Sequence, residues 1–253
     1  MKTAIVIPAR YASTRLPGKP LLRQTGKYLV QHVYERASQA RCANLVLVAT
    51  DDPRIAAAVD SFGGRAVLTR RDHPTGTDRV AEVAKQVNAD AIINLQGDEP
   101  LLDPKALDLL ADRLHHDHSA NMATLAVPIQ SLDQFHNPNC VKVVCDCDGR
   151  ALYFSRSPIP FVRDGQPDFA ARPASFLQHL GVYAYRRPFL LQFANLPVQP
   201  VEQLENLEQL RVLGTGNVIQ VGIVEHQALG VDTYEDYEQF VKVYRQMRAA
   251  KAA

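Results

Sequence analysis

Thr3-Ala4-Ile5-Val6-Ile7-Pro8 is a short apolar run rich in β-branched residues, and a loop with basic side chains follows it directly. Apolar runs of the same kind recur along the first two-fifths of the chain, at 44–49, 65–68 and 91–95. Segments with helical patterns separate these runs, at 27–39, 53–59 and 77–87. Strands that are apolar on both faces and alternate with helices predict a parallel sheet covered on both sides. We therefore expect an α/β fold.

The rest of the chain predicts a mixture of elements. Strands are expected at 122–128, 141–145, 151–154, 179–185 and 218–224, and helices at 201–213 and 234–247. The segment 157–173 is rich in Pro, Gly, Asp and Arg, which is typical of a long loop or flap. No internal repeat or low-complexity linker interrupts the chain, so we expect one continuous domain over residues 1–253.

The composition excludes several classes of protein. The chain has 253 residues and a formal net charge of +1, which argues against a strongly basic nucleic-acid binder. No apolar run approaches the ~20 residues of a membrane span, and the N-terminus does not read as a signal peptide. We therefore expect a cytoplasmic protein with no nucleic-acid or membrane partner, whose four cysteines are reduced thiols. The charge is segregated, because residues 1–36 carry +6 and the remaining 217 carry −5.

The loop after the first strand, at 8–20, carries three cations, Arg10, Arg15 and Lys19. Small residues between them let backbone N–H groups approach a ligand, and the cations complement a polyphosphate. The spacing is not that of a P-loop, and a solvated basic loop is the alternative interpretation. Ligands of parallel sheets bind beyond the carboxyl ends of the strands, so the position of the loop favours a phosphate site.

Two aspartates are candidate ligands for a divalent metal ion. Asp98 follows the fourth expected strand, and Asp232 precedes the last expected helix. A carboxylate at the carboxyl end of a strand faces the ligand crevice, and Mg²⁺ prefers few carboxylates together with waters and phosphate oxygens. The alternatives are a turn-forming role for Asp98 and an N-cap role for Asp232. The neighbouring Glu99 is expected only to support the loop.

Other segments allow a structural or a binding interpretation. Thr77 is the expected N-cap of the third helix, and exposed N–H groups at such a helix start also suit a base or a phosphate. His179 and Tyr183 are four residues apart on an expected strand, so both point to one face, either into the core or into a pocket. Glu208 and Gln209 are ordinary helix-surface residues or ligand contacts.

The motif Ile7-Pro8-Ala9-Arg10-Tyr11-Ala12-Ser13-Thr14-Arg15-Leu16-Pro17-Gly18-Lys19-Pro20 resembles the signature of the 3-deoxy-D-manno-octulosonate cytidylyltransferases, also called CMP-Kdo synthetases. Matching segments follow in order over nearly the whole chain, at 49–52, 72–79, 94–100, 137–139, 141–144, 151–156, 179–183, 207–211 and 230–233. Generic sugar nucleotidyltransferases share mainly the first loop, so the longer match is specific. The departures from the family pattern are Tyr28, Thr75, Pro158 and the segment 163–173.

The resemblance implies a Rossmann-like, mostly parallel sheet of the nucleotide-diphospho-sugar transferase type. Residues 1–120 would form a CTP-binding half, 121–230 a mixed-strand half for sugar binding and dimerisation, and 231–253 a closing helix. The implied reaction transfers CMP from CTP to the anomeric hydroxyl of 3-deoxy-D-manno-octulosonate (Kdo), giving CMP-Kdo and pyrophosphate for lipopolysaccharide biosynthesis. The resemblance also implies a homodimer and a Mg²⁺ cofactor.

The same resemblance assigns the candidate site residues to three sets. The catalytic residues would be Arg10, Lys19, Asp98 and Asp232, of which the two aspartates hold the metal. The nucleotide-binding residues would be Pro8, Ala9, Arg10, Ser13, Arg15, Lys19, Thr50, Asp51, Arg70, Thr75 and Gly76. The sugar-binding residues would be Gln96, Arg156, Arg163, His179, Tyr183, Glu208 and Gln209.

Three other functions stay open from the sequence. One is a cytidylyltransferase for a related acidic sugar, such as 8-amino-Kdo or a sialic acid. Another is a glycosyltransferase, since that class usually carries an Asp-x-Asp pair and Asp146-x-Asp148 is one, although Gly149 after it indicates a hairpin turn. The third is a nucleotide-sensing module, which would bind CTP without releasing pyrophosphate.

Overall fold

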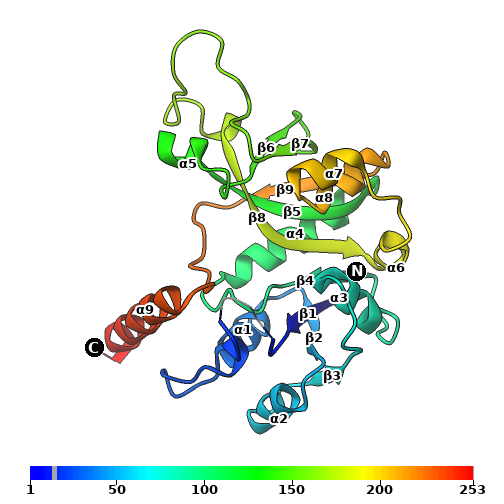
Figure 1. Ribbon diagram of the computed structural model, residues 1–253, viewed down its shortest axis with the longest axis vertical. Helices are drawn as coiled ribbons and strands as arrows, with labels where there is room; N and C mark the ends of the chain where they lie inside the picture. Colours follow the sequence, from blue (N-terminus) through cyan, green and yellow to red (C-terminus); the bar gives the residue numbers. More distant parts are fainter. Residues whose placement is uncertain (13–15, 253) are drawn as a thin grey trace. The chain divides into compact units, whose positions relative to one another are not determined.

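The computed structural model describes residues 1–12 and 16–252, and the chain divides into two compact units (Figure 1). Unit 1 comprises Met1–Asp108 and Ala228–Ala253, and unit 2 comprises Leu109–Gln227. The C-terminal segment therefore belongs to the same unit as the N-terminal strands. The single domain expected from the sequence, with its halves at 1–120 and 121–230, stays a prediction.

The described part of unit 1 is built on four parallel strands. They are β1 (Thr3–Ala9), β2 (Ala43–Thr50), β3 (Ala66–Leu68) and β4 (Ala91–Asn94). β1 lies between β2 and β4, and β3 pairs with the other edge of β2. Ala4, Ile5, Val6 and Ile7 of β1 are completely buried, as expected for a strand covered on both faces. The predicted parallel α/β arrangement is confirmed.

The helices that lie wholly within unit 1 include the connections between its strands and the C-terminal helix. They are the 3₁₀ helix η1 (Lys19–Leu21), α1 (Leu29–Ala37), α2 (Pro53–Ser61), α3 (Gly76–Ala84) and α9 (Tyr234–Ala252). A further helix, α4 (Pro104–His116), begins in unit 1 and was not predicted. Pro53 lies at the first turn of α2, and the Asp52 side chain accepts a hydrogen bond from the Arg54 backbone N–H at 2.9 Å. A capping carboxylate and Pro in the first turn explain why α2 begins there.

The C-terminal helix α9 is anchored to α1 by an apolar and aromatic cluster. Its core consists of the buried side chains Leu16, Leu29, Val231, Tyr237, Phe240 and Val241. The His32 ring on α1 contacts the Phe240 and Tyr244 rings edge-on, with centroids 5.0 and 4.5 Å away. Burial lowers the pKa of His32 to about 4, so this ring is neutral at pH 7. The cluster fixes the start of α9 against α1.

Unit 2 is a mixed set of strands centred on β5 (Ala120–Pro128). β8 (Leu177–Arg186) pairs antiparallel with β5, and β9 (Val218–Ile223) pairs parallel with it. β6 (Lys142–Cys145) pairs antiparallel with both β7 (Ala151–Ser155) and β8. The mixed strand region that the family resemblance implied is therefore present.

The helices of unit 2 are short. They are α5 (Leu132–His136), the 3₁₀ helix η2 (Pro173–Ser175), α6 (Arg187–Phe193), α7 (Pro200–Glu205) and α8 (Gln209–Gly214). The single helix predicted at 201–213 is wrong, because Asn206 adopts a left-handed conformation with φ of 51° and separates α7 from α8. Asn tolerates this conformation better than most residues, and Leu204 before it is 86% exposed while Leu210 after it is buried. The leucine periodicity thus spans two helices with different orientations.

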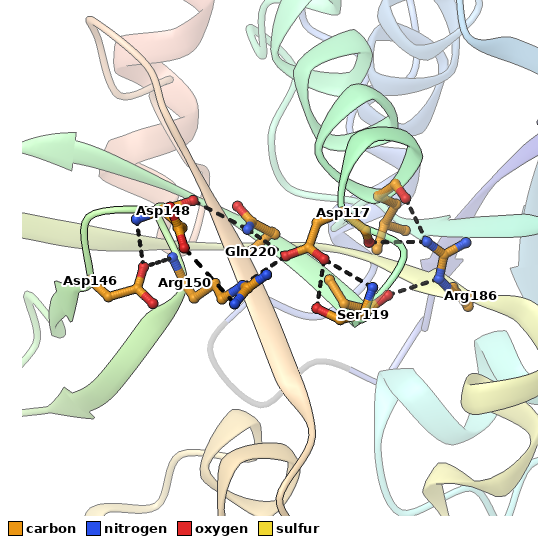
Figure 2. A network of polar contacts seen from close by, with 9 residues as sticks. Asp117, Ser119, Asp146, Asp148, Arg150, Arg186 and Gln220 are labelled. Atoms are coloured by element: carbon orange, nitrogen blue, oxygen red, sulfur yellow. Dashed lines mark hydrogen bonds and ion pairs between the residues drawn. The ribbon is translucent and has the colours of Figure 1, made fainter.

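A polar network holds the β6–β7 turn against other parts of unit 2 (Figure 2). The Asp117 carboxylate accepts hydrogen bonds from Arg150 Nε and Gln220 Nε2, both at 2.9 Å, and from the Ser119 hydroxyl at 2.6 Å. The side chain of Asp146 accepts the backbone N–H of Asp148 at 2.9 Å and that of Arg150 at 2.8 Å. Asp146 therefore shapes the turn, as the hairpin interpretation of the Asp-x-Asp pair predicted.

Candidate functional site

A cavity of about 330 Å³ lies in unit 1 beyond the carboxyl ends of β1 and β4. Its lining consists of Pro8, Ala9, Arg10, Ala12, Lys19, Pro20, Gly76, Gln96, Gly97 and Asp98. The set includes all four of the first loop's described nucleotide-binding candidates together with the predicted metal ligand Asp98. Sequence reasoning placed a phosphate site at this edge of the sheet, and the structure has a cavity there.

Two glycines, Gly97 and Gly76, lie close to Pro8 at the cavity. A Cβ on Gly97 would lie 2.9 Å from the carbonyl oxygen of Pro8, which is closer than real Cβ atoms come. Gly76 at the start of α3 lies against the Pro8 ring, with 3.7 Å between an added Cβ and Cγ. Only glycine therefore fits at position 97 without a shift of the backbone, whereas Gly76 makes an ordinary contact with the Pro8 ring. Gly97 was not among the predicted site residues, although it stands within a quoted motif.

Lys19 brings the two predicted metal ligands together. Its ammonium donates to Asp98 Oδ2 and to the Val231 carbonyl oxygen, each at 2.9 Å, and lies 3.6 Å from Asp232 Oδ1. The backbone N–H of Val231 donates to the Asp98 carbonyl oxygen at 2.8 Å. Residues more than a hundred positions apart thus form one cluster, in which the Lys19 side chain is 14% exposed.

The donor set of this cluster fits a hard divalent cation. Two carboxylates converge on one positive charge, and Mg²⁺ prefers few protein carboxylates with the rest of its shell from water and phosphate. In the described ranges 1–12 and 16–252, no group of three or more His, Cys, Asp or Glu side chains gathers as a metal cage. The Asp98 and Asp232 pair therefore suits a metal that arrives with phosphate oxygens better than a fully protein-bound metal.

The N-cap interpretation of Asp232 is wrong. Thr233 Oγ1 accepts the backbone N–H of Asp236 at 3.2 Å, and Asp236 Oδ2 accepts the backbone N–H of Thr233 at 2.9 Å. This reciprocal pair is a capping box, so Thr233 caps α9. The carboxylate of Asp232 instead faces the Lys19 ammonium.

Glu99 adjoins the cluster and has a shifted pKa. Burial, and then the neighbouring Asp98 carboxylate, raise the pKa of Glu99 to about 7. A partly protonated Glu99 adds less negative charge beside Asp98 than an ordinary glutamate would.

Arg10 is held by the segment that leads into α3. Its Nη2 donates to the His73 carbonyl oxygen at 3.1 Å. The His73 ring pairs with the Glu82 carboxylate, which also accepts the Arg70 backbone N–H at 3.2 Å. Arg10 therefore has a fixed support at one nitrogen, while Arg70 keeps an exposed side chain beside Asp72.

The segment 75–79 starts α3 differently from the prediction. Thr75, rather than Thr77, is the N-cap: its Oγ1 accepts the Asp78 N–H at 3.1 Å and the Asp78 carboxylate accepts the Thr75 N–H at 3.2 Å. The capping box shifts the helix start to Gly76 and buries Thr77 in the first turn. The predicted nucleotide-binding residue Thr75 thus has a defined structural role as well.

Arg79 is a buried residue that sequence reasoning did not include in the site. It is completely buried, its Nη1 donates to the Thr69 hydroxyl, and its Nη2 lies 3.0 Å from Asp51 Oδ1. Burial lowers its pKa, and the Asp51 carboxylate opposes that effect. Arg79 therefore joins the carboxyl ends of β2 and β3, where the candidates Thr50 and Asp51 stand. The apolar face of α3 gave no signal for a charged residue at this position.

In unit 2, three of the predicted sugar-binding residues lie together. The rings of His179 and Tyr183 on β8 are 5.5 Å apart, and the Tyr183 hydroxyl donates to Gln209 Oε1 at 3.4 Å. Gln209 Nε2 is buried and has no hydrogen-bond partner among the described residues. Burial, and then the nearby Glu208 carboxylate, raise the pKa of Tyr183, so its hydroxyl stays protonated. An unsatisfied buried amide beside a protonated phenol suits a ligand with oxygen acceptors.

His179 is a neutral hydrogen-bonding group. Its Nε2 lies 2.9 Å from Thr124 Oγ1, and its ring contacts the Phe154 ring edge-on at 5.0 Å. Burial lowers its pKa to about 3. The ring does not carry a charge at pH 7, so the geometry favours binding over a charged role.

The remaining candidates, Arg156, Arg163, Ser13 and Arg15, differ in how far the structure describes their contacts. Arg156 Nε donates to the Glu205 carbonyl oxygen at 2.7 Å and its Nη1 to that of Pro138 at 3.0 Å, so backbone groups occupy much of its guanidinium. The Arg163 side chain is 92% exposed in the predicted long loop, where no helix or strand spans 157–172. Ser13 and Arg15 lie outside the described residues.

A cavity with cationic side chains beyond the carboxyl ends of parallel strands is typical of α/β proteins that bind phosphate-bearing ligands. A family model described as cytidylyltransferase matches residues 4–219. A 3-deoxy-manno-octulosonate cytidylyltransferase of Syntrophobacter fumaroxidans is 52% identical over 97% of this chain and 98% of its own length. The enzyme of that name from Geobacter sulfurreducens is 49% identical over 96% of this chain and 99% of its own. The chain therefore belongs to the 3-deoxy-manno-octulosonate cytidylyltransferase family, and it is a nucleotidyltransferase.

Solved structures agree with this assignment. A CMP:2-keto-3-deoxy-manno-octonic acid synthetase complexed with CTP is 47% identical and superposes with a TM-score of 0.91, covering 98% of this chain and 100% of its own. A cytidylyltransferase of Leptospira borgpetersenii, 20% identical with a TM-score of 0.61 over 95% of this chain and 85% of its own, shares the fold. Among the described residues, none of the helices is long and apolar enough to span a membrane.

Proposed function

We propose that this chain transfers CMP from CTP to the anomeric hydroxyl of Kdo and releases pyrophosphate. The observation that carries the proposal is the cluster of Lys19, Asp98 and Asp232 at the cavity of unit 1, in a chain about half identical to enzymes of that name. A cation and two carboxylates beside a cation-bearing loop are what a metal-bound triphosphate requires. The product would serve lipopolysaccharide biosynthesis, as the family resemblance implies.

On the nucleotide side, the cations of the first loop bind the triphosphate and offset its charge. Arg10 is held at the His73 carbonyl oxygen, which leaves its other guanidinium nitrogens for phosphate oxygens. Lys19 stabilises charge that develops on the leaving pyrophosphate. Thr50, Asp51, Arg70, Thr75 and Gly76 remain proposed contacts of the nucleoside, together with the loop residues Ser13 and Arg15.

Asp98 and Asp232 would hold the magnesium ion. When bound, the ion neutralises phosphate charge and lowers the pKa of a coordinated sugar hydroxyl. The chain's own contribution is to keep the two carboxylates converged, through Lys19 and the Val231 backbone. No side chain is then required as a dedicated base for the attacking hydroxyl.

On the sugar side, the residues of unit 2 bind and orient the acidic sugar. Tyr183 and Gln209 offer a hydroxyl and an unsatisfied amide to sugar oxygens, and neutral His179 adds a hydrogen-bonding group. Arg156 and Arg163 are the proposed partners of the sugar carboxylate, with Glu208 as a further contact. Gln96, the remaining proposed sugar contact, belongs to unit 1 and lines the cavity there. Catalysis then comes mainly from positioning and charge neutralisation.

The substrate is tested by pyrophosphate release with CTP, Mg²⁺ and a panel of sugar acids. We expect the highest kcat/KM with Kdo rather than with 8-amino-Kdo or a sialic acid. A preference for either of the others would assign the alternative substrate. CTP binding without pyrophosphate release from any acceptor would instead favour the nucleotide-sensing module.

Three further expectations belong to this proposal. A homodimer and a cytoplasmic location follow from the family resemblance and the sequence. The loop at 157–173 is proposed to close over substrate, in keeping with its lack of helix and strand up to residue 172. Sedimentation velocity tests the dimer, and protease sensitivity of the loop that does not change on adding CTP and Kdo would contradict closure.

A further inference from the structure

Lys142 on β6 is a buried lysine that the proposed chemistry does not use. Its exposed fraction is zero, and its ammonium donates to two backbone carbonyl oxygens, that of Asn137 at 2.9 Å and that of Arg156 at 2.6 Å. Burial lowers its pKa, while Cys140 and Glu205 favour its charged form. A buried charge is costly unless hydrogen bonds compensate it, and the two carbonyl oxygens provide that compensation. The presence of a buried lysine at this position therefore calls for a functional or structural reason.

One of these carbonyls belongs to Arg156, which is held from several sides. The Arg156 N–H donates to Glu205 Oε2 at 2.9 Å, while its guanidinium donates to the Glu205 carbonyl oxygen at 2.7 Å and to the Asn206 carbonyl oxygen at 3.3 Å. Glu205 Oε1 accepts the Ser155 hydroxyl at 2.6 Å. Lys142 therefore fixes the backbone of Arg156, whose guanidinium binds the turn between α7 and α8.

That turn carries two candidate sugar contacts. Asn206 has its left-handed conformation there, Glu208 follows, and α8 begins at Gln209, whose amide meets the Tyr183 hydroxyl. The strand that carries Lys142 also reaches β8, because Lys142 pairs with Gln178 and the His179 N–H donates to the Val141 carbonyl oxygen at 2.8 Å. Lys142 thus connects to both elements of the sugar side.

We infer that Lys142 is a positioning residue for the sugar acid, whose buried ammonium fixes Arg156 and, through it, the turn that places Glu208 and Gln209. The inference rests on the proposed assignment of the sugar-side residues. Lys142 touches none of the reacting groups, so it acts through Arg156. Replacing it with an apolar residue would leave two buried carbonyls without a donor and loosen the turn, while the nucleotide side in unit 1 keeps all its contacts.

The first test compares Lys142→Met with a matched control, Arg186→Met. Arg186 also holds backbone carbonyls in unit 2, those of Leu114 at 2.6 Å, Asp117 at 3.1 Å and Ala120 at 2.8 Å, but it belongs to the network around Asp117 (Figure 2). Both variants should lower Tm. We expect only Lys142→Met to raise the KM for Kdo, by about tenfold, because small misplacement of binding groups costs one to two orders of magnitude. Its KM for CTP should change by less than about twofold. Equal effects of the two variants on the KM for Kdo would overturn the inference.

A second variant keeps the test informative if Lys142→Met does not fold. Glu205→Gln weakens the same network at a half-buried position and should raise the KM for Kdo by about threefold, since a charge-assisted hydrogen bond becomes a neutral one. An unchanged KM would overturn the inference. Gln209→Ala separates this result from the site assignment: if it leaves the KM for Kdo unchanged, the sugar side itself is misassigned, whereas a raised KM with normal Lys142→Met and Glu205→Gln kinetics rejects only the role of Lys142.

Discussion

The proposed nucleotide side in unit 1 and the proposed sugar side in unit 2 differ in charge and in burial. The first is a half-exposed cluster of opposite charges, in which Lys19 joins Asp98 and Asp232 at a cavity beyond parallel strands. The second has a buried and uncharged centre, with His179 neutral, Tyr183 protonated and one Gln209 donor unsatisfied. Charged side chains that remain partly exposed to water suit a triphosphate, because they neutralise its charge. Buried hydrogen-bonding groups in fixed positions suit a sugar acid with many hydroxyls.

The largest expected effect is the loss of kcat in Asp98→Ala, on the nucleotide side. Loss of one of two converging carboxylates should lower kcat by about a thousandfold at saturating CTP and Mg²⁺, because charge neutralisation is the main catalytic contribution there. Pyrophosphate release measures the effect, and Tm should fall little since Asp98 is partly exposed. A near-normal kcat would remove Asp98 from the metal site.

Arg79→Met should cause the largest loss of stability. The substitution removes the buried partner of Asp51 and the donor to Thr69, which costs about 3 kcal/mol for a buried pair broken on one side. Urea denaturation measures this change. Arg54→Met is the matched control, because the Arg54 side chain is 59% exposed and its pair with Asp52 should contribute much less to stability. Similar losses in the two variants would contradict a special role for the buried pair.

Lys19→Met separates catalysis from folding within the cluster. We expect kcat to fall by about a hundredfold, as for loss of one charge-stabilising donor, with a small change in Tm. Lys27→Met, which breaks the exposed pair with Glu35, should leave both quantities unchanged. A Tm loss that accounts for the lost activity would make Lys19 structural.

The smallest expected effect is the pH dependence of stability that arises from His179 on the sugar side. His179 has a folded-state pKa of about 3 against about 6.5 in the unfolded chain, so protons bind only the unfolded state as pH falls below 6.5. Stability should therefore decrease on acidification, by about 0.7 kcal/mol from this residue between pH 7 and pH 6. Urea denaturation at both pH values should show that His179→Gln loses that much less than the wild type. Identical losses would mean that His179 titrates normally in the fold.

The parallel strands and most of the nucleotide side were predictable because the sequence features that indicate them are local. Continuous apolar runs alternate with helices, and Arg10, Lys19 and Asp98 each follow such a run or its loop. The convergence of Asp232 on Lys19 depends on the packing of α9 against α1, which only the family resemblance anticipated.

The misses have physical causes in competing local interactions. Asp78 reaches back to Thr75, so the capping box moved the start of α3 away from the expected Thr77. Asn206 broke a leucine pattern that read as one helix. The contacts of Lys142 with Arg156 and of Arg79 with Thr69 join separate segments, 14 and 10 positions apart. Buried cations on apolar strands and helix faces leave no periodic signal.

The most direct test of the division between the two sides is a pair of KM values measured by pyrophosphate release. For Arg10→Ala we expect the KM for CTP to rise by about tenfold, as for loss of a charge-assisted contact, with the KM for Kdo unchanged. For Gln209→Ala we expect the reverse, a raised KM for Kdo and an unchanged KM for CTP. If either variant changes both KM values equally, the separate nucleotide and sugar sides described above are wrong.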